Sequence, residues 1–261
     1  MDILFTADPL NTFKIHKETT YAMMRAAQAR GHSIWTCTSN ALFAKGDVQA
    51  NAQQIQLLEH AVPAHWFDVT QSDTKALHSF DAIVMRKDPP FDSEFFYATH
   101  MLGQAEREGA KVFNKPSALR EHPEKLAIME FAQFISPTLV TRSAQDIRAF
   151  HAEHKDIILK PLDGMGGMGI FRVGEDGRNL GSIIETLNQG GSTSVMVQKF
   201  LPDIVHGDKR VLIIGGKPVP FCLARIPQGN EVRGNLAAGG KGVARPLEEQ
   251  DKAIAEFIGE R

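Results

Sequence analysis

The sequence Leu159-Lys160-Pro161-Leu162-Asp163-Gly164-Met165-Gly166-Gly167-Met168-Gly169-Ile170-Phe171 decides how the second half of the chain folds. Its glycines lie between two apolar runs, residues 157–160 and 170–173, that are typical of short strands. The spacing of Gly164, Gly166 and Gly169 matches G-x-G-x-x-G, but a dinucleotide site needs a helix after the glycines. A P-loop is excluded as well, because no lysine followed by a hydroxyl residue comes after them. The segment therefore predicts a glycine-rich loop that joins two strands.

A glycine-rich loop of this kind can cover the triphosphate of a nucleotide. Glycines let backbone N–H groups approach the phosphates, and Lys160, just before the loop, supplies positive charge. Lys125 lies upstream, in a helix predicted over residues 116–136. Two lysines from different elements would counter the charge on the α- and β-phosphates of ATP. From the residues alone, a glycine hairpin without a ligand and a solvated lysine on a helix surface stay open as alternatives.

Residues on the C-terminal side of the loop offer further nucleotide contacts. The apolar strand predicted at Val195–Gln198 continues to a turn at Pro202, and Asp208 follows. Adenine needs an apolar slot with backbone donors and acceptors, and a ribose is often held by a carboxylate. Residues 197–202 and Asp208 supply these groups, although a buried strand entering a turn explains them equally well.

Two arginines lie on neighbouring strands of a predicted hairpin. The strands are expected at Arg210–Ile214 and Pro218–Ala224, with a two-glycine turn between them, and Arg225 follows the second. The arginine fork binds both oxygens of a carboxylate, so Arg210 and Arg225 suit a clamp for a carboxylate substrate. Arginines on an exposed strand face are the alternative. The glycine-rich stretch 228–242 carries no core pattern, and we expect either a lid or a disordered segment there.

The first 114 residues alternate short apolar runs with helical patterns, which is typical of a mostly parallel α/β layer, whereas from Thr138 onward an α+β pattern takes over. One predicted strand, Ala82–Met85, ends in Arg86-Lys87-Asp88-Pro89-Pro90. Ligands collect at the carboxyl ends of strands in open α/β sheets, so this placement suggests a role in binding. The other predicted strands are Ile3–Thr6, Ser33–Cys37 and Lys111–Asn114, and the predicted helices are Glu18–Arg30 and Ser93–Glu108.

The composition of the chain excludes several classes of protein. With 261 residues, 43% of them hydrophobic, the chain suits one large globular domain or two to three small ones. The formal net charge of −2 gives no attraction to nucleic acid or to an anionic membrane. Cys37 and Cys222 form neither a disulfide framework nor a metal-spaced cluster. Without signal-peptide features or an apolar stretch near the roughly 20 residues that span a bilayer, we expect a cytoplasmic protein.

Three longer motifs resemble the bacterial glutathione synthetase family of the ATP-grasp superfamily, in order and in spacing. They are Met85-Arg86-Lys87-Asp88-Pro89-Pro90-Phe91-Asp92, the run from Leu159 to Gly167, and Arg225-Ile226-Pro227-Gln228-Gly229 through Gly234-Asn235-Leu236-Ala237-Ala238-Gly239-Gly240. The resemblance covers essentially the whole chain. It implies an α/β and α+β fold, with an N-terminal parallel α/β (pre-ATP-grasp) domain at residues 1–122 and an ATP-grasp domain at residues 123–261. The second domain would comprise a central lid subdomain at about 123–198 and part of a C-terminal subdomain at 199–261.

The resemblance also implies an activity: ATP-dependent ligation of γ-glutamylcysteine and glycine to glutathione through an acyl phosphate, giving ADP and phosphate. The loop from Ile226 to Lys241 would shield the acyl phosphate from water. Arg210 and Arg225 are the implied catalytic residues, and Arg86 and Asn235 the implied substrate-binding residues. The implied ATP-binding residues are Lys125, Lys160, Gly164, Gly166, Gly167, Gly169, Gln198, Lys199, Leu201 and Asp208.

The family's magnesium ligands, an Asp and a Glu-x-Asn pair, lie on a further strand, and the resemblance implies that this chain ends at Arg261 before reaching it. Mg²⁺ prefers near-octahedral oxygen ligation, so its ligands are expected in that missing segment and no metal ligand is assigned here. The resemblance implies a homotetramer as well. The alternatives are another ATP-grasp ligase, such as a D-alanine–D-alanine or glutamate-adding ligase, and a nucleotide-binding fragment without turnover.

Overall fold

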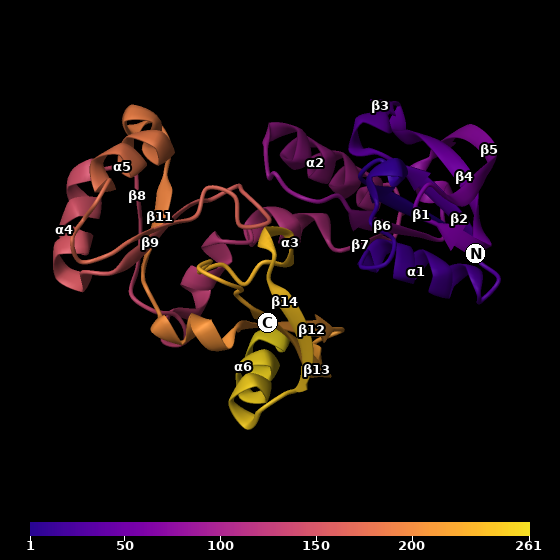
Figure 1. The fold of residues 1–261 in the computed structure, drawn as a ribbon. Coiled ribbons are helices and arrows are strands. Elements are labelled where there is room, and N and C mark those ends of the chain that lie inside the picture. The colour runs from indigo at the N-terminus through magenta and orange to yellow at the C-terminus, as the bar shows by residue number, and fades with distance from the viewer. The chain divides into compact units, whose positions relative to one another are not determined.

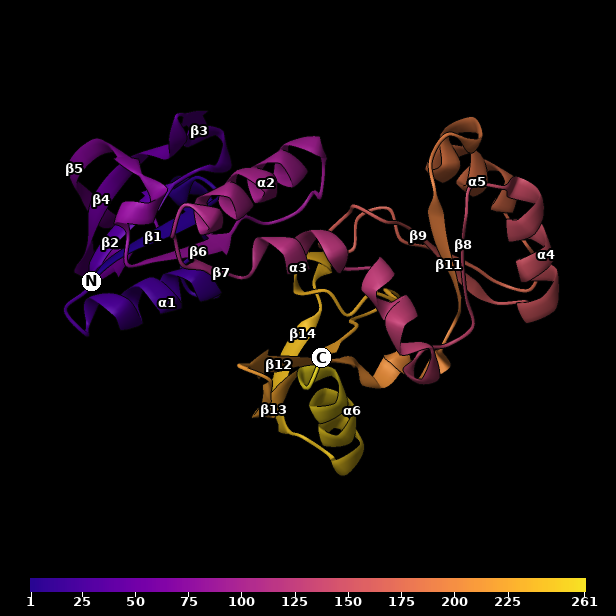
Figure 2. The ribbon, with the colours of Figure 1, turned by 180° about the vertical axis from the view of Figure 1, so that it is seen from behind.

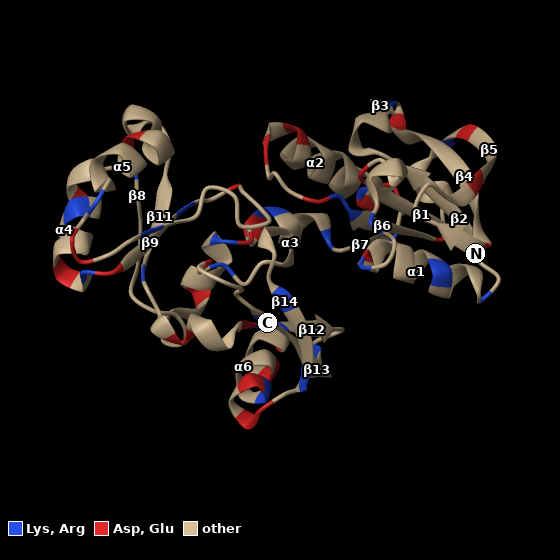
Figure 3. Ribbon diagram, in the orientation of Figure 1, with Lys and Arg blue, Asp and Glu red and all other residues tan.

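The computed structural model describes residues 1–261, which divide into two compact units, Met1–Glu124 and Lys125–Arg261. Acidic and basic residues are interspersed along both units (Figure 3). No helix in either unit has the length and apolar character needed to cross a membrane. Short 3-10 helices occur at Leu10–Thr12, Ser39–Ala41, Leu77–Ser79, Leu126–Phe134, Gln189–Gly191, Pro202–His206 and Leu236–Ala238.

Unit 1 is built on a seven-stranded mixed sheet (Figure 1). Four strands run parallel in the order β2-β1-β6-β7, and β4 joins them antiparallel beside β2. Both β3 and β5 pair with β4 in antiparallel fashion. The strands are β1 (Asp2–Ala7), β2 (Ser33–Cys37), β3 (Leu42–Lys45), β4 (Asp47–Val62), β5 (His65–Ala76), β6 (Ala82–Arg86) and β7 (Val112–Phe113).

Helices cover both faces of this sheet because neighbouring strand residues point to opposite sides. Leu4 of β1 packs with residues of α2 (Ser93–Arg107), whereas Phe5 packs with residues of α1 (Thr19–Gln28). Both views of the ribbon show α1 and α2 on opposite sides of the sheet (Figures 1 and 2). The strands predicted in this half are confirmed, as are the two helices. A third helix, α3 (Pro116–Glu121), follows β7.

The long antiparallel hairpin of β4 and β5 was not predicted from the sequence. The buried positions on β4 are Val48, Ala50, Ala52, Ile55 and Leu57. Their period of two shifts at the irregularity between Gln54 and Ile55, so the alternation does not run through the strand. On β5 most residues are exposed, so an apolar strand pattern is missing. The sheet is therefore parallel only in its β2-β1-β6-β7 part. The antiparallel hairpin can add to it because antiparallel strands need burial on one face only.

The first sheet of unit 2 is antiparallel, in the order β10-β9-β11-β8. Ile157 and Leu159 of β9 are fully buried against α4 and α5, which lie on the same face of the sheet (Figure 1). This cluster is the core of the region, and the predicted strands at β9, β10 and β11 are confirmed. The elements are β8 (Thr138–Thr141), α4 (Ala144–His154), β9 (Ile157–Pro161), β10 (Phe171–Val173), α5 (Leu180–Asn188) and β11 (Val195–Lys199).

The second sheet of unit 2 has three antiparallel strands, β12 (Asp208–Ile214), β13 (Lys217–Ile226) and β14 (Lys241–Pro246). The predicted hairpin of β12 and β13 is confirmed. Helix α6 (Glu249–Gly259) packs on one face of this sheet. Lys209 and its cross-strand partner Ala224 lie on that face, and Lys209 donates hydrogen bonds to Glu248 and Asp251 at the start of the helix. Acidic residues gather at the start of this helix (Figure 3), where their negative charge interacts favourably with the positive end of the helix dipole.

The helix predicted over residues 116–136 is interrupted, and Lys125 is not inside it. The α-helix α3 ends at Glu121, and a 3-10 helix runs from Leu126 to Phe134. His122 leaves the helical region, with φ −121° and ψ 65°, because the ring of the following Pro123 disfavours an α-helical conformation there. Lys125 is the residue just before the 3-10 helix, so it lies in the connection between the two helices and not inside either of them.

Replacement of Leu159 tests the core of unit 2. Leu159→Ala is expected to lower the free energy of unfolding by about 2–5 kcal/mol, because it leaves a cavity at a fully buried position. Urea denaturation followed by circular dichroism measures the loss. Leu212→Ala, at a position that is 52% exposed, is the control and should change stability by less than about 0.5 kcal/mol. Equal losses in the two variants would contradict this packing.

Cys37 gives a pH-dependent prediction. Burial raises the pKa of the Cys37 thiol to about 11, and the hydroxyl of Thr6, 3.6 Å from its sulfur, opposes this effect only in part. In the unfolded chain the thiol ionises near pH 8.5, so the native state holds the proton more tightly. This contribution to stability is complete below about pH 8.5 and is lost as the pH rises towards 11.

The Cys37 prediction is checked by alkylation with iodoacetamide at pH 9 and peptide mass spectrometry. Cys37 should react slowly in the native protein and fast in urea. The urea midpoint of the wild type should also fall more steeply between pH 8 and pH 10 than that of Cys37→Ala. Fast native alkylation of Cys37 would contradict the burial that raises the pKa.

Candidate active site

Strand β9 separates a core face from a pocket face. Leu159 points into the core, and its neighbours Ile158 and Lys160 line a pocket on the other side of the sheet. On the adjacent strand β11, Gln198 is the direct partner of Ile158 and lies on the same face, where its side-chain amide donates to Thr138 Oγ1 at 2.9 Å. The period of two along both strands thus places a cation and an amide beside apolar groups.

The pocket has a volume of about 230 Å³ and is lined by residues of the first sheet, by Asp208 of β12 and by residues 232–235. Six apolar side chains line it together with seven polar or charged ones, so it offers both apolar surface and polar groups to a small ligand. Leu201 is 57% exposed at its rim. The lining residues are Ser136, Ile158, Lys160, Ile170, Gln198, Lys199, Phe200, Leu201, Ile204, Asp208, Val232, Arg233, Gly234 and Asn235.

The glycine-rich loop between β9 and β10 is held by contacts from two other segments. Lys125 Nζ donates to the carbonyl oxygen of Gly164 at 2.5 Å. Arg233 donates to the carbonyl oxygen of Gly167 at 2.9 Å. Gly167 has φ +86°, a conformation that favours glycine, and a Cβ built there would lie 2.9 Å from Asn235 Oδ1, so the Asn235 side chain would have to shift. Residues 233–235 therefore pack directly on the loop.

Arg233 was not singled out by the sequence analysis, although it joins the loop to the pocket. Its guanidinium also pairs with the carboxylate of Glu231. The hydrogen bond from Arg233 lowers the pKa of Glu231 to about 2, so this carboxylate stays ionised throughout the physiological range. No sequence motif marks Arg233, because its contact with Gly167 depends on how the 228–240 segment folds against the glycine-rich loop.

Asp208 and Arg225 form a two-pronged ion pair across β12 and β13. The two residues are cross-strand partners, and Arg225 Nε lies 2.9 Å from Asp208 Oδ1 while Nη2 lies 2.5 Å from Oδ2. Both oxygens of Asp208 are therefore engaged by Arg225. Arg210 lies two residues along from Asp208 and thus on the same face of the sheet, and it is exposed.

Gly234 lets the 228–240 segment lie against this ion pair. A Cβ at Gly234 would collide with the carbonyl oxygen of Arg225 and would lie 3.1 Å from Asp208 Oδ1. Gly234 is also buried. The close approach of this backbone to β12 and β13 explains why the pocket has a wall where the sequence predicted a lid or a disordered segment.

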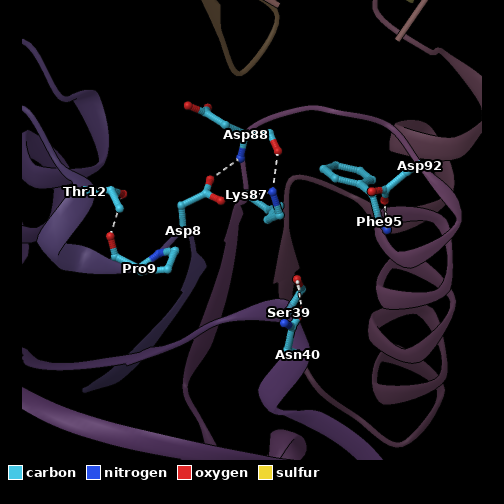
Figure 4. A network of polar contacts seen from close by, with 9 residues as sticks. All are labelled: Asp8, Pro9, Thr12, Ser39, Asn40, Lys87, Asp88, Asp92 and Phe95. Atoms are coloured by element: carbon cyan, nitrogen blue, oxygen red, sulfur yellow. Dashed lines mark hydrogen bonds and ion pairs between the residues drawn. The ribbon is translucent and has the colours of Figure 1, made fainter. Parts of the chain in front are cut away.

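In unit 1, Arg86 lies at the carboxyl end of β6, and its Nε donates to Thr20 Oγ1 at 3.1 Å. Next to it, Asp8 accepts a hydrogen bond from the backbone N–H of Asp88 at 2.7 Å and pairs with Lys87 Nζ at 3.0 Å (Figure 4). Lys87 also donates to the carbonyl oxygen of Asp88 at 2.8 Å. These contacts tie the segment after β6 to the residue that follows β1. Asp8 was not among the predicted residues.

A larger hollow, of about 740 Å³, opens at the carboxyl ends of β1 and β2 and is bounded by the β4–β5 hairpin. Its lining is rich in hydroxyl and amide groups, and it contains no lysine or arginine. Asp8 takes part in this lining, whereas none of the residues predicted for ATP or substrate does. The unpredicted hairpin thus builds a wall of this cavity in unit 1.

No three His, Cys, Asp or Glu side chains of the chain gather in an arrangement that could hold a metal ion. Asp208 is the acidic residue of the smaller pocket, and Arg225 occupies both of its oxygens. Since Mg²⁺ takes oxygen ligands, and carboxylates above all, these residues do not form a magnesium site. No protein ligand to Mg²⁺ is therefore assigned.

The structure brings together many of the residues predicted from the sequence. Lys160, Gln198, Lys199, Leu201, Asp208 and Asn235 share the smaller pocket. Gly164 and Gly167 lie in the adjacent loop, where Lys125 and Asn235 contact them. Arg225 contacts the pocket through Asp208, whereas Arg86 belongs to unit 1.

Comparisons with known families agree with this division. The family model described as the prokaryotic glutathione synthetase N-terminal domain matches residues 1–120, and the one described as the prokaryotic glutathione synthetase ATP-grasp domain matches residues 124–261. The chain belongs to the prokaryotic glutathione synthetase family. Glutathione synthetase of Ralstonia nicotianae is 55% identical over 261 residues, which cover 99% of this chain and 79% of that protein. Glutathione synthetase of Neisseria meningitidis serogroup A is 54% identical, with 99% and 82% covered.

Solved structures support the fold of this glutathione synthetase family member. D-cycloserine synthetase DcsG matches with a TM-score of 0.62 at 15% identity, covering 99% of this chain and 80% of that chain. D-alanyl-alanine synthetase A from Vibrio cholerae matches with a TM-score of 0.59 at 15% identity, covering 100% and 79%. At such identities the likeness shows the fold alone, and the expected fold, an N-terminal domain followed by an ATP-grasp domain, is confirmed.

Gly234 provides a test of the pocket wall in this glutathione synthetase family member. Gly234→Ala is expected to cost about 1–3 kcal/mol, because the added methyl group meets backbone that cannot move aside. The control is Gly174→Ala, where a Cβ has no neighbour closer than 4.0 Å. Thermal unfolding of the two variants should show a lower midpoint for Gly234→Ala alone. Equal midpoints would mean that the 228–240 segment does not pack on the Asp208–Arg225 pair.

Proposed function

We propose that the chain is an ATP-dependent ligase that joins γ-glutamylcysteine to glycine and yields glutathione, ADP and phosphate. The observation that carries the proposal is the placement of Lys160 and of a glycine-rich loop, held by Lys125 and Arg233, at one small pocket. Such a loop can cover phosphate groups while the pocket takes a base. Membership of the glutathione synthetase family supports the choice of substrates.

ATP is proposed to bind with its adenine among the apolar residues of the pocket. Gln198, Lys199 and Leu201 would line the adenine, and Asp208 would lie near the ribose while it holds Arg225. Lys125 and Lys160 would counter the charge of the phosphates, and the loop glycines Gly164, Gly166, Gly167 and Gly169 would leave room for backbone N–H groups to approach them.

The reaction proceeds in two steps in this proposal. An oxygen of the terminal carboxylate of γ-glutamylcysteine forms a bond to the γ-phosphorus of ATP, and the bond to ADP breaks. The amine of glycine then forms a bond to the acyl carbon, the bond to the phosphate oxygen breaks, and a proton leaves the nitrogen. Arg210 and Arg225 would stabilise the negative charge that develops, while Arg86 and Asn235 bind the dipeptide.

Four further features belong to the same proposal. Residues 123–198 and 199–261 would act as two subdomains, each built on one of the two sheets of unit 2. Mg²⁺ would accompany ATP and neutralise phosphate charge. The protein would work in the cytoplasm as a homotetramer, as the family resemblance implies. The chain spans 79–83% of the length of several relatives, and the activity of the chain itself is the property to measure first.

The test is ADP release by the chain with MgATP, adding γ-glutamylcysteine and glycine separately and together. Release that requires both substrates is the expected result, because the acyl phosphate forms on the dipeptide and is consumed by glycine. Release with D-alanine or glutamate in place of glycine would instead favour another carboxylate–amine ligase. Binding of ATP without release under any condition would favour a nucleotide-binding protein without turnover.

Lys160→Ala is expected to abolish ADP release, since it removes a cation from the phosphate end of the pocket. Lys217→Ala, at an exposed position of β13 outside the pocket lining, is the matched control and should leave the rate unchanged. If Lys160→Ala turned over ATP at the wild-type rate, the assignment of the loop to the phosphates would be wrong.

A further inference from the structure

The order in which the parallel strands of unit 1 are added to the sheet reverses between β1 and β6. From β1 the chain passes to β2 on one side, and later to β6 and β7 on the other. In open α/β sheets, ligands bind outside the carboxyl ends of the two strands where the order reverses. Asp8 follows β1 at this place, and Arg86, Lys87 and Asp88 end and follow β6.

The charges at this strand end leave one negative charge in excess. The charges of two carboxylates, Asp8 and Glu18, and of two cations, Arg86 and Lys87, act on the carboxylate of Asp88. Two of the carboxylates already have bonding partners. Asp8 forms an ion pair with Lys87 and accepts a hydrogen bond from the backbone N–H of Asp88, and Glu18 accepts one from the backbone N–H of Thr20 as the N-cap of α1. The remaining charge therefore belongs to Asp88.

The carboxylate of Asp88 makes no described hydrogen bond, although the backbone of the same residue is fixed on both sides. Its N–H donates to Asp8, and its carbonyl oxygen accepts from Lys87. Figure 4 shows the carboxylate pointing away from both of these residues. Asp88 is an exposed residue and is therefore accessible to a ligand. Desolvation of its carboxyl group, with the nearby charges of Asp8 and Glu18, raises the pKa of Asp88, so an incoming cation would relieve an unfavourable charge.

Arg86 presents the complementary charge two residues earlier. Its Nε is engaged by Thr20 Oγ1, which fixes the plane of the guanidinium, and its terminal nitrogens make no described contact. A guanidinium held in this way can bind both oxygens of a carboxylate. An arginine and a carboxylate with unused bonding capacity, on one rigid strand end, match the two charges of an α-amino acid.

We propose that Asp88 binds the α-ammonium group of the γ-glutamyl residue of the substrate, while Arg86 binds its α-carboxylate. This inference rests on the proposed ligase function and adds a specificity-determining residue to it. Asp8 acts as a positioning residue, since its contacts with Lys87 and with the backbone of Asp88 fix the strand end. The site would thus require a free α-amine on the dipeptide and discriminate against analogues that lack it.

The test compares the binding of γ-glutamylcysteine with that of N-glutarylcysteine, the analogue without the α-amine, by isothermal titration calorimetry with the full chain. A charge-assisted hydrogen bond to the ammonium predicts that the wild type binds γ-glutamylcysteine about 10- to 100-fold more tightly. Asp88→Asn should lose this preference and leave the affinity for N-glutarylcysteine unchanged. Asp88→Glu, which keeps the charge, should retain part of the preference.

Glu94→Gln is the matched control, because Glu94 is an exposed carboxylate nearby in the sequence and makes no described side-chain bond. It should keep the full preference. Circular dichroism checks that each variant is folded, and Asp88→Ser serves as a second variant without the charge. A preference that survives in Asp88→Asn and Asp88→Ser, or its absence from the wild type, would overturn the role of Asp88 while ADP release still supported the ligase. If the wild type neither bound γ-glutamylcysteine nor released ADP with it, the proposed function would fail as well.

Discussion

The burial of Ile157 and Leu159 against α4 and α5 is the constraint on which the nucleotide pocket depends. Because strand side chains alternate, fixing these two residues in the core fixes Ile158 and Lys160 on the opposite face. A shift of one residue in register would bury the lysine and expose the leucine, at a large cost in desolvation. The core of unit 2 therefore stabilises the fold and aims the proposed phosphate-binding lysine at the same time.

The second constraint is the close packing around the glycine-rich segments. Gly234 lies against the backbone of Arg225, and Gly167 lies against the side chain of Asn235. These contacts bring the loop between β9 and β10 together with the segment that connects β13 and β14 of the second sheet. An ATP-grasp ligase needs to enclose a reactive acyl phosphate, and backbone groups packed at this density exclude water well.

In unit 1, polar contacts hold the strand ends that carry Arg86 and Asp88. Asp8, Lys87 and the backbone of Asp88 form a small network that holds the carboxyl ends of β1 and β6 together. A carboxylate that bonds both a lysine and a backbone N–H leaves few conformations open to the strand end. The side chains of Arg86 and Asp88 are thereby presented from a rigid frame, which limits the entropy that a bound zwitterion would have to offset.

Most strands and the helices α1 and α2 could be predicted from the sequence by itself, because their apolar periods are clear and the stops at Gly31 and Gly109 are strong local signals. The glycine-rich loop between β9 and β10 was equally evident, and so was the family, since motifs such as residues 85–92 are long and ordered. The β4–β5 hairpin was missed because the period of the buried residues on β4 shifts between Gln54 and Ile55, and because most residues of its second strand are exposed. What only the tertiary structure decided are the long-range pairs: Lys125 with Gly164, Arg233 with Gly167, and Asp208 with Arg225. A sequence pattern records the period of an element, whereas these bonds depend on which loops the packed sheets bring within about 3 Å of one another.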